Sequence, residues 1–181
     1  TINSIKNYKC KIIFQKNKGY GDALINGINS VRTKFFCIFN ADGSFDPKEL
    51  PKMFKKLNKS DGDLIFGTRY EYNCGSEDDT IVTSIGNFFF TKVGRIFFGL
   101  NLTDILYTYV LGRTDLVKKL SLRYLDFRFC IELPIKAKRK GYKLQNSASF
   151  ERSRIGGKKK VNAIRDGILI LTGMIYLFFK R

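Results

Sequence analysis

The residue types that could do chemistry lie in short polar segments that follow apolar runs of strand length. The run Phe35–Phe39 ends in Asn40-Ala41-Asp42-Gly43-Ser44. In open α/β sheets, ligands bind outside the carboxyl ends of the strands, and this segment would lie there. Its amide and carboxylate oxygens are hard ligands that suit Mg²⁺ or Mn²⁺ on a diphosphate. The alternative is a strand-to-helix turn in which these side chains only cap.

Two further segments carry groups that suit phosphate. Gly19-Tyr20-Gly21 opens a predicted helix, where glycines allow close backbone approach and free N–H groups attract an anion. The alternative is a tight strand-to-helix turn with Gly27 for close packing, and no Gly-Lys-Ser/Thr of a Walker A loop follows. Arg69 follows the predicted strand 63–67, and its guanidinium could clamp a phosphate or form a surface salt bridge.

The chain contains no histidine, which narrows its chemistry. Ser–His and Cys–His nucleophiles and mixed Cys/His zinc sites are therefore excluded. The four cysteines are far apart and form no CxxC pair, a pattern that favours a reducing compartment. Carboxylates, amides, Lys and Arg remain. The cluster Glu77-Asp78-Asp79 is a candidate for a general base or an exposed acidic loop.

The charge balance indicates a polyanionic partner. Lys and Arg number 33 against 16 acids, which gives a net charge of +17, and residues 136–160 are especially basic. Nucleic acid, an anionic membrane and phosphorylated substrates all fit such a charge, and a solvated surface accounts for part of it. The aromatic residues lie in apolar runs and no nucleic-acid reading motif occurs, so we expect no specific nucleic acid. A non-specific nucleic-acid-binding domain is the alternative.

The elements that must position these residues alternate between strands and helices. With 181 residues and 44% hydrophobic content, the chain can form a sizeable core. Apolar runs predict strands at 11–15, 35–39 and 63–67 and an edge strand at 144–150. Helical periodicity predicts helices at 23–28, 47–57, 81–98 and 126–140, the last containing Pro134. This order predicts an α/β fold with a mostly parallel sheet flanked by helices.

The order and spacing of these segments resemble a known family. The matching residues are Asn17–Leu24, Asn40–Ser44, Pro47 with Leu50-Pro51, Gly67–Arg69, Thr103-Asp104, Glu132 and Arg152–Lys160. From about residue 11 to residue 167 the chain resembles the family 2 glycosyltransferases, and within them the dolichol-phosphate mannosyltransferase-like branch. The resemblance implies a GT-A (Rossmann-like) fold. It also implies inverting transfer of a sugar from a nucleotide-sugar donor to a polyprenyl phosphate or glycan acceptor, with Mg²⁺ or Mn²⁺.

The resemblance also implies roles for individual residues. The candidate catalytic residues are Asp42, Arg69 and Glu132. The candidate donor-binding residues are Gly19, Gly21, Asn40 and Asp42, and the candidate metal ligands are Asn40, Asp42 and Ser44. The candidate acceptor-phosphate residues are Arg69, Arg152, Arg154 and Lys158. An anionic phosphate acceptor needs no general base, whereas a sugar hydroxyl would need a carboxylate such as Asp79 or Asp104.

The chain departs from the family pattern at three places. Asn40 stands where the family has Asp, which removes one negative charge. Residues 104–109 diverge, which leaves the acceptor open. The family's first strand and the loop that grips the nucleobase have no counterpart. We therefore expect an N-terminally truncated chain in which residues 1–9 are a helix tail, and a catalytically inactive fragment is a further alternative.

The last thirty residues suggest contact with a membrane. We predict a glycosyltransferase domain at 1–150, followed at 151–181 by a basic loop and an interfacial apolar helix. The apolar stretch 168–179 is shorter than the ~20 residues that span a bilayer. Beside a basic loop it is expected to lie peripherally on the cytoplasmic face of a membrane. A buried core helix and a shortened transmembrane helix are the alternatives.

Overall fold

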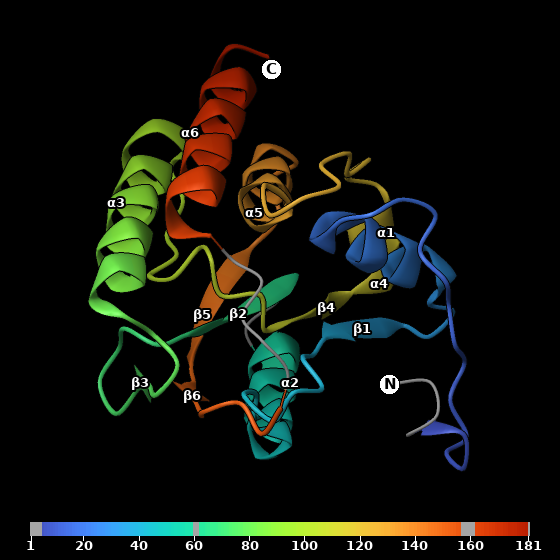
Figure 1. Ribbon diagram of the computed structural model, residues 1–181. Helices are drawn as coiled ribbons and strands as arrows, with labels where there is room; N and C mark the ends of the chain where they lie inside the picture. Colours follow the sequence, from blue (N-terminus) through green and yellow to red (C-terminus); the bar gives the residue numbers. More distant parts are fainter. Residues whose placement is uncertain (1–4, 60–61, 157–161, 181) are drawn as a thin grey trace.

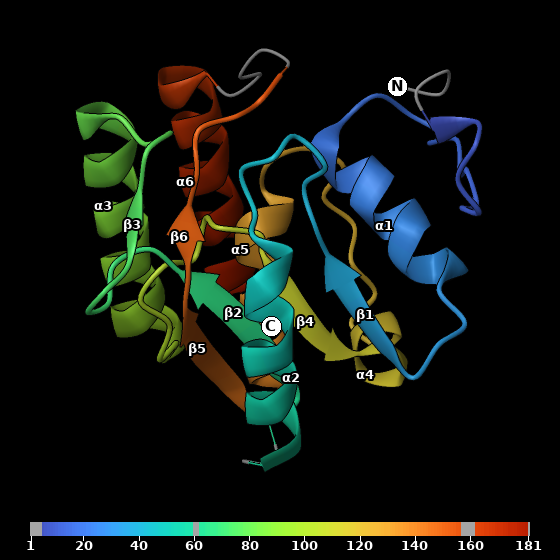
Figure 2. The ribbon, with the colours of Figure 1, turned by 90° about the horizontal axis from the view of Figure 1, so that it is seen from below.

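The computed structural model describes residues 5–59, 62–156 and 162–180, which form a central sheet covered by helices on both faces (Figures 1 and 2). The sheet has four strands in the order β1-β4-β2-β5, and β3 and β6 form a separate two-stranded sheet. The strands are β1 (Phe35–Ile38), β2 (Leu64–Thr68), β3 (Gly75–Ser76), β4 (Val110–Arg113), β5 (Leu144–Ala148) and β6 (Phe150–Glu151).

Three of the four strands in the main sheet point the same way. β2 and β5 are parallel, whereas β4 is antiparallel to both of its neighbours, β1 and β2. The expected α/β fold is confirmed, but the reversed strand β4 was not predicted. Because β4 is reversed, its amino end lies with the carboxyl ends of β1, β2 and β5. The segments that follow those three strands, and residues 104–109 before β4, therefore share one edge of the sheet.

The helices cover the two faces unequally. The α2 helix packs against β2, β4 and β5 on one face, and the remaining helices form the layer on the other face. The helices are α1 (Tyr20–Ser30), the 3₁₀ turn η2 (Pro47–Glu49), α2 (Leu50–Lys59), α3 (Ile81–Phe98), α4 (Thr114–Lys118), α5 (Phe129–Arg139) and α6 (Ala163–Phe179).

Side chains of β2 point alternately to the two sides of the sheet and so contribute to both core clusters. Leu64 and Phe66 point into the large core that α5 and α6 complete, whereas Ile65 packs with Met53 and Leu57 of α2. Successive side chains of a strand face opposite sides, so one strand serves both layers. Every residue of β2 is buried, as expected for a strand covered on both faces.

The bounds of α3 agree with the sequence prediction because both ends have local signals. Thr80 and Thr83 form a reciprocal capping box at the start of the helix, and Gly99 ends it with φ 63°. The predicted helix at 126–140 is also present, but α5 begins later, at Phe129, and includes Pro134. Helical periodicity located both helices correctly.

The prediction for the first residues was wrong. Residues 11–15 were expected to be a strand, yet they run as an irregular segment, with Phe14 exposed. A strand needs a neighbour for its backbone groups, and no described strand pairs with this segment. Residues 5–9 form no α-helix either, and residues 1–4 lie outside the described part.

The last helix is longer than predicted and belongs to the core. It begins at Ala163, and its residues Ile170, Met174 and Leu177 are buried in the large core cluster beside α3 and α5. Among the described residues, no helix is both long enough and apolar enough to cross a membrane. The domain boundary at residue 150 stays a prediction.

Candidate active site

The edge of the sheet that collects the carboxyl ends of β1, β2 and β5 holds most of the predicted site residues. The loop after β1 and the segment after β6 lie side by side there. The backbone N–H of Ile155 donates to the carbonyl of Asp42 at 2.8 Å, and that of Arg152 donates to the carbonyl of Ser44 at 2.9 Å. These two bonds bring the predicted metal loop and the predicted phosphate-binding arginines together.

The carboxylate of Asp42 is held on both sides. Its Oδ1 accepts from the backbone N–H of Ser44 at 3.1 Å and from the Ser44 hydroxyl at 2.7 Å. Its Oδ2 lies 3.5 Å from Nη1 of Arg154. Partial burial alone would raise the pKa of Asp42, but the bonds from Ser44 and the charge of Arg154 hold it below its ordinary value. Asp42 is therefore ionised at neutral pH.

Gly43 allows the turn that places Asp42 and Ser44 together. Its φ of 91° is one that L side chains rarely adopt, and an added Cβ would lie 2.7 Å from the side chain of Ile155. Glycine reaches this conformation without strain. The turn alternative therefore describes this segment, since the Asp42 carboxylate accepts from Ser44 within it and Gly43 supplies the bend. Metal binding by the segment stays a prediction.

Arg154 bridges two carboxylates. Besides its contact with Asp42, its Nε and Nη2 both lie 3.2 Å from Oδ2 of Asp78. The neighbouring Ser153 donates its backbone N–H to Glu77 at 2.9 Å. The acidic cluster at 77–79, whose role was left open by the sequence, therefore positions the arginine segment.

Arg69 lies in a buried network of ion pairs. Its Nε is 2.7 Å from Asp104, and its Nη1 is 2.9 Å from Glu151. A third carboxylate, that of Asp79, lies 3.7 Å from the same Nη1. Burial alone would lower the pKa of Arg69, but these carboxylates raise it above its ordinary value. The guanidinium predicted to clamp a phosphate is engaged by carboxylates in a buried network, whereas the alternative was a salt bridge at the surface. A contact of Arg69 with phosphate stays a prediction.

Asp79 and Asp104, the two carboxylates suggested as a base for a sugar hydroxyl, are not suited to that role. Asp104 is fully buried and also accepts from Asn87 at 2.6 Å. Asp79 accepts from the hydroxyls of Tyr70, Thr83 and Ser84. Burial alone would raise the pKa of Asp79, but these hydrogen bonds and Arg69 lower it. A carboxylate with a depressed pKa is a weak proton acceptor.

Glu132 positions a loop, and the catalytic role that the resemblance implied for it stays a prediction. It is buried in α5, where it accepts from the backbone N–H groups of Arg123 and Tyr124, at 2.9 and 2.8 Å, and pairs with Lys136 at 2.6 Å. These contacts fix the segment 121–125, against which the start of α1 packs. Its oxygens are thereby engaged by the loop and by Lys136.

Gly19 and Gly21 pack against that same loop. An added Cβ would lie 2.0 Å from the carbonyl oxygen of Leu125 at Gly19, and 2.1 Å from that of Tyr124 at Gly21. Asp22 continues the contact by donating its backbone N–H to Leu125 at 3.0 Å. Close packing therefore describes Gly19 and Gly21, but not Gly27, where the alternative placed it and where an added Cβ would meet no atom within 4 Å. A contact of Gly19 or Gly21 with the donor stays a prediction.

Several residues of this edge were missed by sequence reasoning. Tyr20 stacks on Phe127, with ring centroids 4.9 Å apart, and bonds the hydroxyl of Thr108. Burial raises the pKa of Tyr20 first of all, and the nearby charge of Asp42 raises it further. Its place between two glycines was the only local signal. No local sequence signal indicated the roles of Asp78 and Glu151, because the arginines that they pair with are distant in the sequence.

The donor set suits a cation that arrives with a substrate. In the described part of the chain, no group of three or more His, Cys, Asp or Glu could hold a metal ion. Asp42 supplies one carboxylate, with the amide of Asn40 two residues before it and the Ser44 hydroxyl bonded to it. Mg²⁺ is commonly bound by one or two carboxylates together with substrate phosphates. Lys158, a further phosphate candidate, lies outside the described residues.

The comparison with protein families decides the membership of the chain. The model of the family described as Glycosyl transferase family 2 matches residues 1–121. The chain belongs to glycosyl transferase family 2. The low-salt glycan biosynthesis hexosyltransferase Agl6 of Haloferax volcanii is 30% identical over 95 residues, which are 51% of this chain and 23% of that protein. An uncharacterized glycosyltransferase of Mycobacterium tuberculosis is 34% identical over 59 residues, 33% of this chain and 27% of the relative.

Solved structures of similar fold include those of an enzyme from Mycobacterium tuberculosis. The glucosyl-3-phosphoglycerate synthase of Mycobacterium tuberculosis with UDP superposes with a TM-score of 0.64 and 14% identity, over 90% of this chain and 56% of that one. Its complex with Mn²⁺, UDP and phosphoglyceric acid superposes with a TM-score of 0.65 and 14% identity, over 90% of this chain and 55% of that one. These likenesses show the GT-A-like fold. The chain spans about a quarter of the length of these curated relatives and about half of these structures.

Proposed function

We propose that this family 2 glycosyltransferase transfers a hexosyl group from a nucleotide-sugar donor to a phosphate acceptor, with inversion. One observation carries the proposal: the ionised carboxylate of Asp42 and the guanidinium of Arg154 lie together at the edge where α/β sheets bind ligands. A cation-binding carboxylate beside an arginine is the pair of groups that a diphosphate requires.

The donor side of the site accounts for the leaving group. A divalent cation, when bound with the diphosphate, would offset the negative charge that develops on it as the sugar departs. Asp42 would hold that cation, with the Asn40 oxygen beside it. Arg154 would pair with diphosphate oxygens, exchanging its 3.5 Å contact with Asp42 for a contact with the donor. The Mn²⁺ and UDP bound by the structurally similar synthase support this assignment.

The acceptor side favours a phosphate. The candidate base Asp104 is buried, and Asp79 is engaged by three hydroxyls and Arg69, so neither is free to deprotonate a sugar hydroxyl. An anionic phosphate oxygen attacks the anomeric carbon without losing a proton. The new bond forms as the bond to the diphosphate breaks, which inverts the anomeric centre and releases a nucleoside diphosphate. We propose a polyprenyl phosphate as this acceptor, and a glycan hydroxyl is the competing outcome.

Replacement of Asp42 tests the donor side. We expect Asp42→Asn to lower sugar transfer by about 10²-fold or more, because one charge that holds the cation is lost. UDP with Mn²⁺ should raise the melting temperature of the wild type but not of this variant. The matched control is Asp115→Asn, an exposed surface carboxylate paired with Lys119, which should leave both readouts unchanged.

The assay uses UDP-glucose first and then other nucleotide-sugars, each with a polyprenyl phosphate and with a glycan acceptor. Undiminished transfer by Asp42→Asn would remove the role of Asp42. Transfer to the glycan alone would replace the phosphate acceptor by a hydroxyl. A wild-type chain that neither binds nor turns over any donor would favour the inactive alternative.

A further inference from the structure

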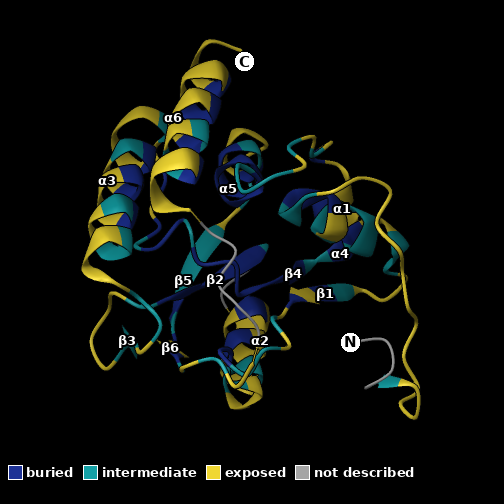
Figure 3. Cartoon of the chain, in the orientation of Figure 1, coloured by how far each residue is buried: buried dark blue, intermediate teal, exposed yellow. Residues whose placement is uncertain are grey.

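The helices α3 and α6 leave a broad apolar surface uncovered. They lie side by side at the outside of the larger helical layer (Figures 1 and 2). Each already buries one stripe in the core, which includes Phe90 and Gly94 of α3 and Met174 and Leu177 of α6. Their opposite sides are apolar too, and Figure 3 shows both helices exposed along their outer sides. Core packing therefore leaves these outer residues unexplained.

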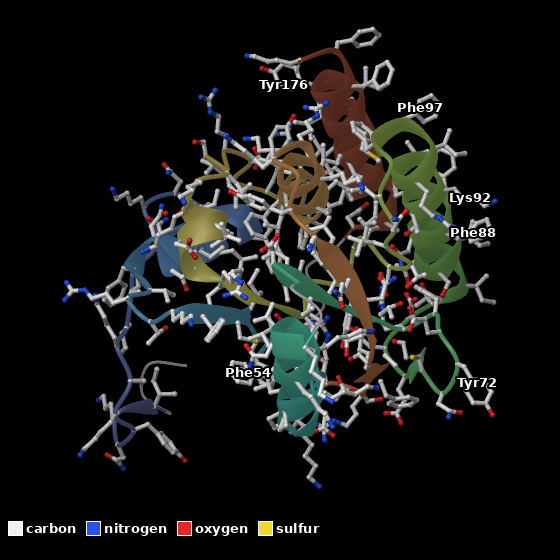
Figure 4. All side chains as sticks on the ribbon, turned by 180° about the vertical axis from the view of Figure 1, so that it is seen from behind. Phe54, Tyr72, Phe88, Lys92, Phe97 and Tyr176 are labelled. Carbon is white, nitrogen blue, oxygen red and sulfur yellow. The ribbon has the colours of Figure 1, made fainter. Side chains whose placement is uncertain are left out.

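The exposed residues follow helical spacing. On α3 they include Ile85, Phe88 and Ile96, and on α6 Ile164, Ile168 and Phe179; we call this surface the α3–α6 face. Phe88 is 66% exposed, Ile96 71% and Phe179 80%. Figure 4 shows Phe88 and Lys92 projecting from α3 away from the body of the protein. Soluble monomers rarely expose a contiguous apolar area of this kind.

The two helices form one continuous face. Phe97 of α3 and Phe178 of α6 pack edge to face near the carboxyl ends of the helices, with ring centroids 5.8 Å apart. Both helices therefore run in the same direction, and the amino end of α3 begins next to Asp79 of the Arg69 network. The face thus starts beside the candidate active site.

The exposed charges that the two helices carry have one sign. The α3 helix contains no acidic residue, and the single acid of α6, Asp166, is buried and accepts from the backbone N–H of Asn162 at 2.8 Å. The cations of these two helices and of the residue after α6 are Lys92, Arg95, Arg165 and Lys180. An anionic surface complements this pattern. A second copy of the chain would bring the same cations against one another in a symmetric contact.

We propose that the α3–α6 face docks the protein on an anionic lipid bilayer. The apolar side chains enter the boundary between head groups and acyl chains, and the cations contact the lipid phosphates. The sequence placed membrane contact in residues 151–181 alone; the structure adds α3 as half of the surface. The inference deepens the proposed function, since docking on this face would present the site to a lipid-linked phosphate, but lipid binding can be measured without any sugar transfer.

Vesicle flotation of the whole chain tests the docking. The wild type should float with phosphatidylcholine–phosphatidylglycerol vesicles and more weakly with phosphatidylcholine alone. Phe88→Asp with Ile96→Asp should lower the partition coefficient about tenfold or more, because two exposed apolar side chains no longer enter the lipid. The matched control is Tyr8→Asp with Phe14→Asp, two exposed aromatic residues in the segment 5–19 on the far side of the molecule in Figure 1.

A charge reversal separates the electrostatic part. Lys92→Glu should weaken binding to the anionic vesicles about tenfold and leave binding to neutral vesicles unchanged. The matched control is Lys55→Glu, at an exposed position of α2 on the opposite face of the sheet. It should change binding to neither kind of vesicle.

Three results would overturn the docking proposal. One is a wild type that floats with neither vesicle. Another is flotation that survives Phe88→Asp with Ile96→Asp. The third is a wild-type dimer that this variant converts to a monomer while neither protein binds lipid, which would assign the face to self-association. Asp42→Asn should still float while failing to transfer sugar, so failure of docking and failure of the proposed reaction are distinguishable.

Discussion

Arg69 and its partners show how single residues define this protein. Three carboxylates, those of Asp79, Asp104 and Glu151, lie within 4 Å of one guanidinium, so negative charge is in excess. Neutral donors satisfy the remaining oxygens: Asn87 donates to Asp104, and Ser76 donates to Glu151 at 2.5 Å. The network ties the end of β2 to β6 and to the start of α3. It thereby holds the scaffold around Arg154 and Asp42.

Removal of the Arg69 guanidinium should destabilise the fold. We expect Arg69→Met to lower the free energy of unfolding by about 3–5 kcal/mol, because the fully buried Asp104 would lose its cation. Urea unfolding followed by circular dichroism measures the loss. Lys119→Met removes a cation from an exposed pair with Asp115 and should cost only about 0–0.5 kcal/mol. Equal urea midpoints for the two variants would contradict the structural role of Arg69.

At the scale of elements, the position of α1 depends on close backbone contact at its first turn as well as on side-chain packing. Its first turn touches the segment 124–126, and that segment is held by Glu132 of α5. Tyr20, in the same turn, stacks on Phe127 and bonds the hydroxyl of Thr108, and the charge of Asp42 helps to raise its pKa. A shift of α1 would therefore move one wall of the candidate site.

Two glycine substitutions in the same helix should have opposite effects. In Gly21→Ala the new Cβ would lie 2.1 Å from the carbonyl oxygen of Tyr124, and we expect a loss of about 1–3 kcal/mol. In Gly27→Ala the Cβ would meet no atom within 4 Å, so we expect a gain of about 0.5–1 kcal/mol from helix propensity. Thermal unfolding measures both changes in stability, since each kcal/mol shifts the melting temperature by about 2–4 °C. A Gly21→Ala variant as stable as Gly27→Ala would show that α1 does not need this contact.

For the whole molecule, the net charge of +17 predicts attraction to any polyanion. Non-specific DNA binding at low salt is therefore expected and does not identify the partner. We expect its affinity to fall about 10³-fold between roughly 50 and 200 mM salt, since phosphate contacts release counterions. Anionic liposomes should displace the DNA in a fluorescence anisotropy competition. Binding that resists salt and depends on DNA sequence would favour the nucleic-acid alternative.

The sequence by itself determined the features that depend on near neighbours. The bounds of α3 follow from Thr80 and Gly99, and the 3₁₀ turn before α2 follows from Asp46, whose carboxylate accepts from the N–H of Lys48 at 2.9 Å. The strands β1 and β2 follow from continuous apolar runs, although only β2 is buried throughout and Cys37 of the edge strand β1 is exposed. The apolar run before Asn40 placed Asp42 at the carboxyl end of a strand, where the structure has it, because a strand followed by a polar turn has few other arrangements.

The tertiary structure alone decided which distant groups meet. The reversed strand β4 pairs with β1 and β2, and no local signal gives a strand its partner or direction. Residues 11–15 have strand composition without a partner, so they remain irregular. Arg69 meets carboxylates and Arg154 meets Asp42 because segments up to 112 residues apart, 154 minus 42, share one edge. Ion pairs and sheet registers are contacts across space, and the order of residues along a chain does not specify them.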